Sequence, residues 1–137
     1  MKRTVLGLVL ASLAGCTTPS ASDPEAVAAY GPPPADYRMK VAAYIRQNFY
    51  DPYSIRDAAI APPVLMPGWM IPDVGKAWTV CIMANAKNRM GAYTGRHPTV
   101  FRFKSGEIID SSREGGADYY CEKQPYEPFA EIDAAPA

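Results

Sequence analysis

The sequence predicts an α+β domain, in which one N-terminal amphipathic helix packs on a small antiparallel sheet of three or four strands. Three observations favour this class: a helical apolar face over residues 36–50, two alternating segments over residues 76–86 and 99–104, and a Ser105-Gly106 turn before a further short segment. Helices packed on one side of an antiparallel sheet define the α+β class. An all-β barrel is the alternative if residues 36–50 form no helix.

The helix is expected over residues 36–50, at the start of a single domain that covers residues 36–125. Apolar side chains recur there at helical spacing on one face: Tyr37, Val41, Tyr44, Ile45 and Phe49. Asp36 is placed to cap the start, and Pro52 ends the helix. We interpret the aromatic face as part of the core.

The strands are expected after the helix. Residues 55–61 are a weak candidate, and prolines at positions 62, 63, 67 and 72 then predict a long loop that carries Trp69. Residues 76–86 are apolar on both faces, which is typical of a central strand. Residues 99–104 and 107–111 complete the sheet on either side of the turn. Residues 126–137 are predicted to be a poorly ordered tail.

The N-terminal residues predict export. Lys2 and Arg3 precede an apolar run of about 11 residues, whereas a membrane-spanning helix needs about 20. The run ends in Leu13-Ala14-Gly15-Cys16, which resembles the lipobox of bacterial lipoprotein precursors. The resemblance implies a signal peptide over residues 1–15 and acylation of Cys16. An ordinary secretory signal with a chance cysteine is the alternative.

The same resemblance implies a location for the mature chain. Two or more hydrophobic anchors hold a protein stably on a membrane, so lipidated Cys16 would fix it outside the cytoplasm. Thr17 replaces the aspartate that favours inner-membrane retention, which points to the outer membrane, facing the periplasm. Residues 16–35 are rich in Thr, Ser, Ala and Pro, which predicts a flexible tether, although the prolines could equally mark a helix start.

Cys81 and Cys121 remain once Cys16 is acylated. Because exported compartments are oxidising, such a pair is most simply a disulfide. It would close a loop of about 40 residues and contribute about 4 kcal/mol in the chain-entropy account. A redox-catalytic pair is disfavoured, because the sequence has no Cys-x-x-Cys.

The formal net charge is zero, but the charges are unevenly spread. Between Asp73 and Glu107 there are six basic residues and no acid, and from Glu107 onward the chain is acidic. Either the two halves complement each other in the folded domain, or the basic half forms a face for an anionic envelope partner. Export and balanced charge argue against nucleic acid as a partner.

Residues 85–98, between the two best strands, form the most specialised segment. Its glycines permit tight turns, and it concentrates residue types common at interfaces: Lys87, Asn88, Arg89, Tyr93 and Arg96. One interpretation is an elaborate hairpin in which Tyr93 covers the end of the sheet. The other is a basic, aromatic loop that the sheet presents to a partner.

A second resemblance covers most of the expected domain. The pattern Cys-x-x-x-Asn-Ala-Lys-Asn…Gly-x-Tyr-Thr-Gly, here from Cys81 to Gly95, resembles that of small uncharacterised proteobacterial lipoproteins. The stretch from Tyr37 to Ser54 belongs to the same resemblance. It implies a family without a known activity and identifies no catalytic residue.

The residues favour binding over catalysis. His97 is the only histidine, it precedes Pro98 in a loop, and no Gly-x-Ser-x-Gly elbow is present. One histidine and two paired cysteines do not make a metal site, and there is no phosphate-binding glycine loop, so no metal or cofactor is expected. Asp118 and Glu122 are the carboxylates on which a cell-wall hydrolase or transferase would depend.

We therefore expect a lipid-anchored envelope protein that is not an enzyme. Its segment from Lys87 to Arg96 would contact an envelope protein or an anionic cell-wall polymer. The main alternative is a protein inhibitor of a cell-wall-degrading enzyme such as lysozyme, which rests on analogy with other small disulfide-bonded lipoproteins.

Overall fold

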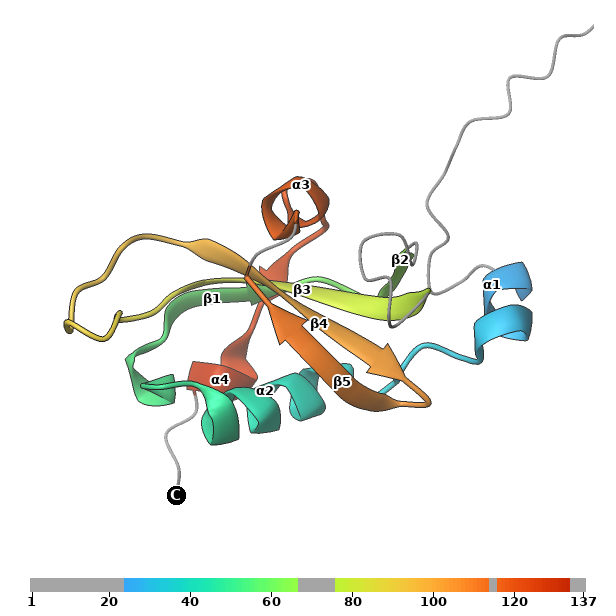
Figure 1. The fold of residues 1–137 in the computed structure, drawn as a ribbon, viewed down its shortest axis with the longest axis horizontal. Coiled ribbons are helices and arrows are strands. Elements are labelled where there is room, and N and C mark those ends of the chain that lie inside the picture. Colours follow the sequence, from blue (N-terminus) through green and yellow to red (C-terminus); the bar gives the residue numbers. More distant parts are fainter. Residues whose placement is uncertain (1–23, 67–75, 114–115, 134–137) are drawn as a thin grey trace, which may run out of the picture.

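The structure is a computed structural model that describes residues 24–66, 76–113 and 116–133. These residues form an antiparallel sheet of six strands with four helices, which lie on both of its faces (Figure 1). The strands are β1 (Arg56–Ile60), β2 (Val64–Met66), β3 (Ala77–Asn85), β4 (His97–Lys104), β5 (Glu107–Ser112) and β6 (Glu127–Pro128). The predicted α+β class is confirmed, but the sheet has more strands than the three or four expected.

The strand order is β5-β4-β3-β1-β6, and β2 also pairs with β3. The helices are α1 (Pro24–Tyr30), α2 (Tyr37–Asn48), α3 (Ala117–Cys121) and α4 (Ala130–Asp133), with a 3₁₀ turn η1 at Pro52–Ser54. In Figure 1, α2 and α4 cover one face of the sheet and α3 lies over the other. The domain therefore has two apolar layers, one on each side of the sheet.

Helix α2 forms where the sequence predicts a helix, and it supplies most of one layer. Val41 and Ile45 are fully buried. Tyr44 meets Phe101 of β4 edge to face at 5.7 Å, and Phe49 stacks on the same ring at 6.3 Å. Asp36 lies at the N-cap position but its side chain makes no capping hydrogen bond; its carboxylate is 3.5 Å from Lys40 Nζ.

Strand β3 is the central strand, as its two apolar faces predict. It pairs with β4 from Trp78 to Ala84 and with β1 and β2 along its other edge. Val80 and Ile82 face the α2 layer, whereas Cys81 belongs to the layer under α3. Alternate side chains of one strand therefore enter both cores.

The disulfide expected between Cys81 and Cys121 is present, and it joins β3 to α3 across a Cα–Cα distance of 5.6 Å. Both cysteines are buried, together with Val100 and Ala117. Because α3 has only five residues, this bond and a few small side chains hold it on the sheet.

Strand β2 lies inside the long loop that the prolines predict. It follows β1 along the same edge of β3, with Val64 opposite Thr79 and the Ala61 N–H donating to the Cys81 carbonyl at 2.9 Å. Pro62 and Pro63, which lack N–H donors, interrupt the strand without redirecting it. The remainder of that loop, with Trp69, lies outside the described residues.

The C-terminal segment differs from the poorly ordered tail predicted beyond residue 125. Strand β6 pairs with β1 at the edge of the sheet, and the Phe129 N–H donates to the Ala58 carbonyl at 3.0 Å. Phe129 is fully buried in the α2 layer, and Ile132 of α4 is buried beside it. The apolar surface that Phe129 buries thus helps to fix the segment after residue 125, which also carries several charged side chains.

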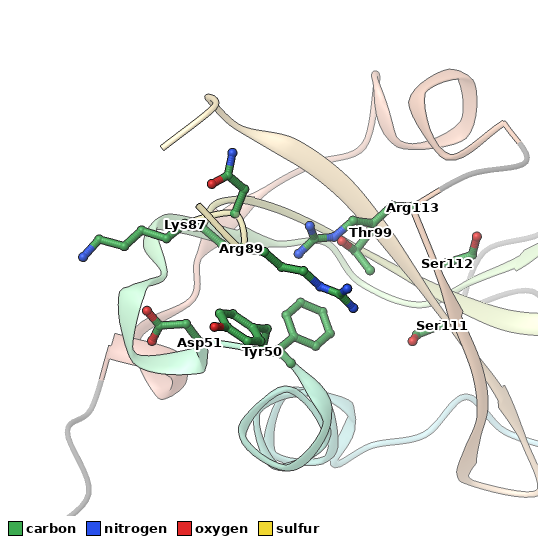
Figure 2. A pocket seen from close by; sticks show the side chains of 11 residues that line it. Tyr50, Asp51, Lys87, Arg89, Thr99, Ser111, Ser112 and Arg113 are labelled. Carbon is green, nitrogen blue, oxygen red and sulfur yellow. The ribbon is translucent and has the colours of Figure 1, made fainter. Parts of the chain in front are cut away.

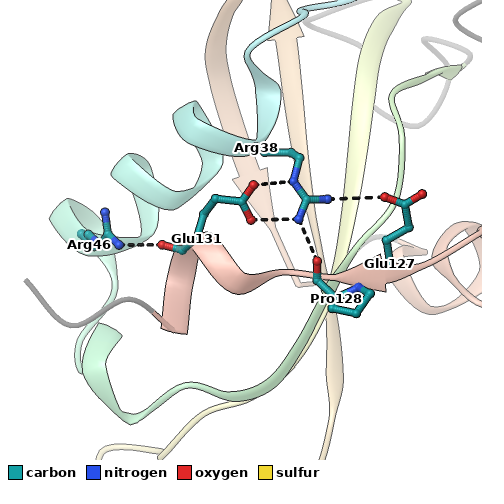
Figure 3. Close-up of polar contacts among 5 residues, drawn as sticks. All are labelled: Arg38, Arg46, Glu127, Pro128 and Glu131. Carbon is teal, nitrogen blue, oxygen red and sulfur yellow. Dashed lines mark hydrogen bonds and ion pairs between the residues drawn. The ribbon is translucent and has the colours of Figure 1, made fainter.

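Arginines of α2 hold this segment in place (Figure 3). Arg38 donates two hydrogen bonds to the Glu131 carboxylate, at 2.6 and 2.8 Å, and a third to the Pro128 carbonyl at 2.7 Å. Arg46 donates to the Glu131 carbonyl at 2.6 Å. Hydrogen bonds from Arg38 lower the pKa of Glu131 below its ordinary value. We call Arg38, Arg46 and Glu131 the C-terminal clasp.

The segment before α2 also differs from the prediction, because α1 forms within the expected tether. Ala26 of α1 is buried in the α2 layer, and Trp78 Nε1 donates to the Gly31 carbonyl at 3.1 Å. Residues 1–23, with the lipobox and Cys16, lie outside the described residues. Among the residues described, no helix is long and apolar enough to cross a membrane.

Replacing Glu131 with glutamine should lower the free energy of unfolding at pH 7 by about 1–2 kcal/mol, because the clasp loses its charge-assisted bonds. Since folding lowers the pKa of Glu131, this stabilisation is present above the ordinary glutamate pKa of about 4.3. It is lost as the pH falls through the folded-state value. Urea denaturation of both proteins from pH 7 to pH 2 measures the difference.

Glu127→Gln is the matched control, because Glu127 is mostly exposed and 3.7 Å from Arg38. It should change stability by less than about 0.5 kcal/mol. A stability loss for Glu131→Gln that stays constant down to pH 2 would contradict a role for the ionised carboxylate.

Candidate binding site at the hairpin between β3 and β4

The segment between β3 and β4 is a structured hairpin. Lys87 and Tyr93 form an isolated antiparallel bridge. The tip is closed by the Asn88 N–H donating to the Ala92 carbonyl and the Gly91 N–H donating to the Asn88 carbonyl, both at 2.9 Å. Asn88 Oδ1 also accepts the N–H groups of Met90 and Ala92. Asn88 therefore fixes the turn, which is a common use of asparagine.

Tyr93 holds the hairpin against the rest of the domain. Two cations lie near its ring, with the Arg56 guanidinium carbon 4.0 Å and Lys87 Nζ 5.6 Å from the ring centroid. Its hydroxyl donates to the Ser54 carbonyl at 2.9 Å, and the Lys87 N–H donates to Ser54 Oγ at 3.1 Å. Tyr93 is thus a positioning residue, in keeping with the interpretation that it covers the end of the sheet.

A pocket of about 400 Å³ opens at the base of this hairpin (Figure 2). Its walls come from the C-terminal end of α2, the first residues of the hairpin, and the adjoining ends of β4 and β5. The lining residues are Phe49, Tyr50, Asp51, Ala86, Lys87, Asn88, Arg89, Thr99, Ser111, Ser112 and Arg113. A cavity of this volume is in the range of small-molecule sites.

Two arginines dominate the pocket. Figure 2 shows Arg89 and Arg113 extending into it from opposite walls, whereas Lys87 points outward and Asp51 lies at the far rim. The Arg113 guanidinium carbon is 5.2 Å from the Phe49 ring centroid. The floor is aromatic and the two opposed side chains are cationic, so the pocket suits an anionic ligand with an apolar part.

Among the described residues, neither arginine of the pocket takes part in an ion pair, although Asp51 also lines the pocket. Within residues 24–66, 76–113 and 116–133, no carboxylate lies within ion-pair distance of Arg89 or Arg113. By contrast, Arg102 of the same basic stretch is buried and pairs with Asp110. The basic stretch is therefore paired with the acidic half in part through Arg102. Among the described residues, Arg89 of the basic stretch and Arg113 of the acidic half form no ion pair.

The predicted binding residues do not form one surface. Lys87, Asn88 and Arg89 line the pocket, and Tyr93 lies behind them. Arg96 is exposed outside the pocket, and its charge acts on Tyr126, whose pKa is raised to about 12 by burial. Arg96 thus belongs to a different surface from Arg89.

Sequence reasoning missed the opposite wall of the pocket. No sequence pattern identified Arg113, Ser111 or Tyr50 as pocket residues. For Ser111 and Arg113, the pairing of strands that follows from the Ser105-Gly106 turn was an available signal. That turn places Lys104 opposite Glu107, and an irregularity between Arg102 and Phe103 then shifts the register by one residue, so that Val100 lies opposite Ser112. The residues after β5 therefore lie beside the start of β4. A register drawn from the turn would have brought Arg113 next to the hairpin.

The other candidate residues lie outside the pocket. His97 is exposed, with Nε2 3.3 Å from the Thr94 carbonyl oxygen. Asp118 and Glu122 are exposed at α3, outside the pocket. In the described part of the chain, no cluster of three or more His, Cys, Asp or Glu side chains is placed to hold a metal ion.

Comparison with protein-family models, with curated protein sequences and with solved structures gives no match for this chain.

Replacing Tyr93 with phenylalanine should lower the free energy of unfolding by about 1 kcal/mol, because the Ser54 carbonyl loses its hydrogen bond while the ring keeps its contacts with Arg56 and Lys87. Tyr53→Phe is the matched control: Tyr53 is 65% exposed, and should change stability by less than about 0.5 kcal/mol. Urea denaturation monitored by circular dichroism measures both. Equal stabilities of the two variants would contradict the anchoring role of the Tyr93 hydroxyl.

Proposed function

We propose that this chain is an exported lipoprotein, anchored through Cys16, whose domain binds an anionic component of the bacterial envelope without catalysing a reaction. The observation that carries this proposal is the pocket at the hairpin, which Arg89 and Arg113 enter from opposite walls, with Arg113 over the Phe49 ring. Neither arginine forms an ion pair among the described residues. Rigid scaffolds commonly present binding residues on such connecting segments.

The arrangement of the domain supports this function in a tethered protein. Gly31, just after α1, is bonded to Trp78 at the start of β3, whereas the hairpin follows Asn85 at the end of that strand. The nine residues of β3 span about 30 Å at about 3.3 Å each, and Figure 1 places α1 and the hairpin at opposite ends of the sheet. A chain held by its N-terminus would therefore present the pocket away from the anchor.

The disulfide supports a location outside the cytoplasm, because such bonds persist mainly in oxidising compartments. Together with Thr17 after the lipobox cysteine, it favours our proposal of the periplasmic face of the outer membrane. The partner there would be a protein or an anionic cell-wall polymer.

A second candidate function is inhibition of a cell-wall-degrading enzyme such as lysozyme. The hairpin favours it, since Met90 at the tip is 92% exposed and the flanking Lys87 and Arg89 are basic. Glycosidases of this kind carry a pair of active-site carboxylates, which a basic projecting loop would complement. In this case the partner is a discrete protein.

Cells fed a radiolabelled fatty acid should incorporate it into the full chain, and Cys16→Ser should abolish the label and release the protein from the membrane fraction. Thr17→Ser should keep both. Label that persists in Cys16→Ser, or a wild-type protein without label, would contradict lipid anchoring at this residue.

A photocrosslinking amino acid in place of Met90 should give an adduct in cells, because Met90 is exposed and directly follows Arg89, which lines the pocket. The same probe at Tyr119, which is 77% exposed on α3, should give none. A discrete band identifies a protein partner, and purified lysozyme tests whether it is an inhibited enzyme. A heterogeneous band that glycan hydrolases collapse identifies a polymer. Equal adducts at both positions, or none at Met90, would contradict binding at the hairpin.

A further inference from the structure

We propose that the pocket at the hairpin recognises an acidic saccharide, a sugar unit that carries a carboxylate or phosphate group. This inference rests on the proposed binding function and specifies its ligand. It follows from three properties of the pocket that occur together: opposed guanidinium groups, an aromatic surface, and polar groups suited to sugar hydroxyls.

The guanidinium groups define the charge of the ligand. Arg89 and Arg113 approach from the hairpin and from the end of β5 (Figure 2). Each guanidinium is a planar fork of donors that matches the oxygens of a carboxylate or a phosphate. Neither arginine forms an ion pair within residues 24–66, 76–113 and 116–133, so binding of an anion breaks no ion pair in that part of the chain.

The aromatic surface shows that an anion alone does not fill the site. Phe49 is fixed by stacking on Phe101 at 6.3 Å. Tyr50, the next residue, is 76% exposed and lies below Arg89 in Figure 2. An exposed aromatic ring in a pocket offers an apolar face with a polar edge, which suits the C–H face of a sugar ring beside its hydroxyls.

Polar groups for those hydroxyls line the rest of the pocket. Ser111 Oγ donates to the Tyr44 hydroxyl at 3.2 Å, which leaves its oxygen lone pairs as acceptors. The Asp51 carboxylate accepts, and the Asn88 side chain, whose Oδ1 is occupied by the turn, has its amide N–H groups as donors. Donors and acceptors thus surround the aromatic surface.

A saccharide fits this pocket better than an acidic peptide does. An extended peptide is commonly held by main-chain hydrogen bonds to an open strand edge. Strand β4, which contributes Thr99 to the pocket, is paired on both edges, with β3 and with β5. At Thr99 the pocket therefore offers side chains in place of an open strand edge, whereas Ser111 and Ser112 belong to β5, the edge strand of the sheet. The pocket volume of about 400 Å³ suits a compact sugar unit rather than an extended peptide.

The test is calorimetric titration of the full-length protein in detergent, at a fixed ionic strength of about 0.15 M to limit long-range attraction. The probes are glucuronate, glucose 6-phosphate, neutral glucose, and inorganic phosphate. We expect glucuronate or glucose 6-phosphate to bind at least tenfold more tightly than glucose and phosphate. The tighter of the two acidic sugars identifies which anionic group the pocket prefers.

The variants separate pocket recognition from general charge. Arg89→Gln and Arg113→Gln should each weaken binding of the acidic sugar at least tenfold, and Tyr50→Ala should weaken it severalfold. Arg96→Gln removes the same charge outside the pocket and should leave binding unchanged. Circular dichroism and the urea midpoint establish that each variant is folded.

Several outcomes would overturn the inference. Inorganic phosphate that binds as tightly as the sugars would make this a simple anion site, and an equal loss in Arg96→Gln would make the effect one of general charge. No binding of either acidic sugar, with a protein adduct at Met90 in cells, would reject the saccharide but retain the proposed function. No sugar binding and no Met90 adduct would reject both.

Discussion

The burial of strand β3 on both of its faces and both of its edges is the constraint on which the rest of the structure depends. Val80 and Ile82 anchor the layer under α2, and Cys81 anchors the layer under α3 through the disulfide. Its first residues hold Gly31 through Trp78, and its last residues lead into the hairpin. Any sequence that kept β3 but lost one layer would leave an apolar strand face in water.

The parts of the fold that follow from periodicity could be predicted. Helix α2 and strands β3, β4 and β5 are long enough for spacing to identify their buried faces. Strand β2 and the segment with β6 and α4 could not be predicted from periodicity, because each is short and flanked by prolines. Their order comes from pairing with distant residues and from the single buried ring of Phe129, which local pattern does not encode.

The candidate site also has a part that could be predicted from the sequence and a part that could not. The hairpin was identifiable because its basic, aromatic and glycine residues lie together in sequence. The pocket was not, because its walls come from four elements whose proximity depends on sheet register. The sequence also does not separate Tyr93, which holds the hairpin, from Arg89, which faces the pocket, or show that Asn88 does both. That separation follows from hydrogen bonds to Ser54 and within the turn.

The anchoring of Tyr93 by Arg56, Lys87 and Ser54 has a thermodynamic consequence for recognition. A hairpin whose ring, hydroxyl and turn are already fixed loses little conformational freedom when a ligand arrives. Association would then proceed with small backbone movement, so that affinity is set mainly by how long the complex lasts once formed. The residues that fix Tyr93 and the hairpin therefore determine how much of the free energy of ligand contacts is retained as binding affinity.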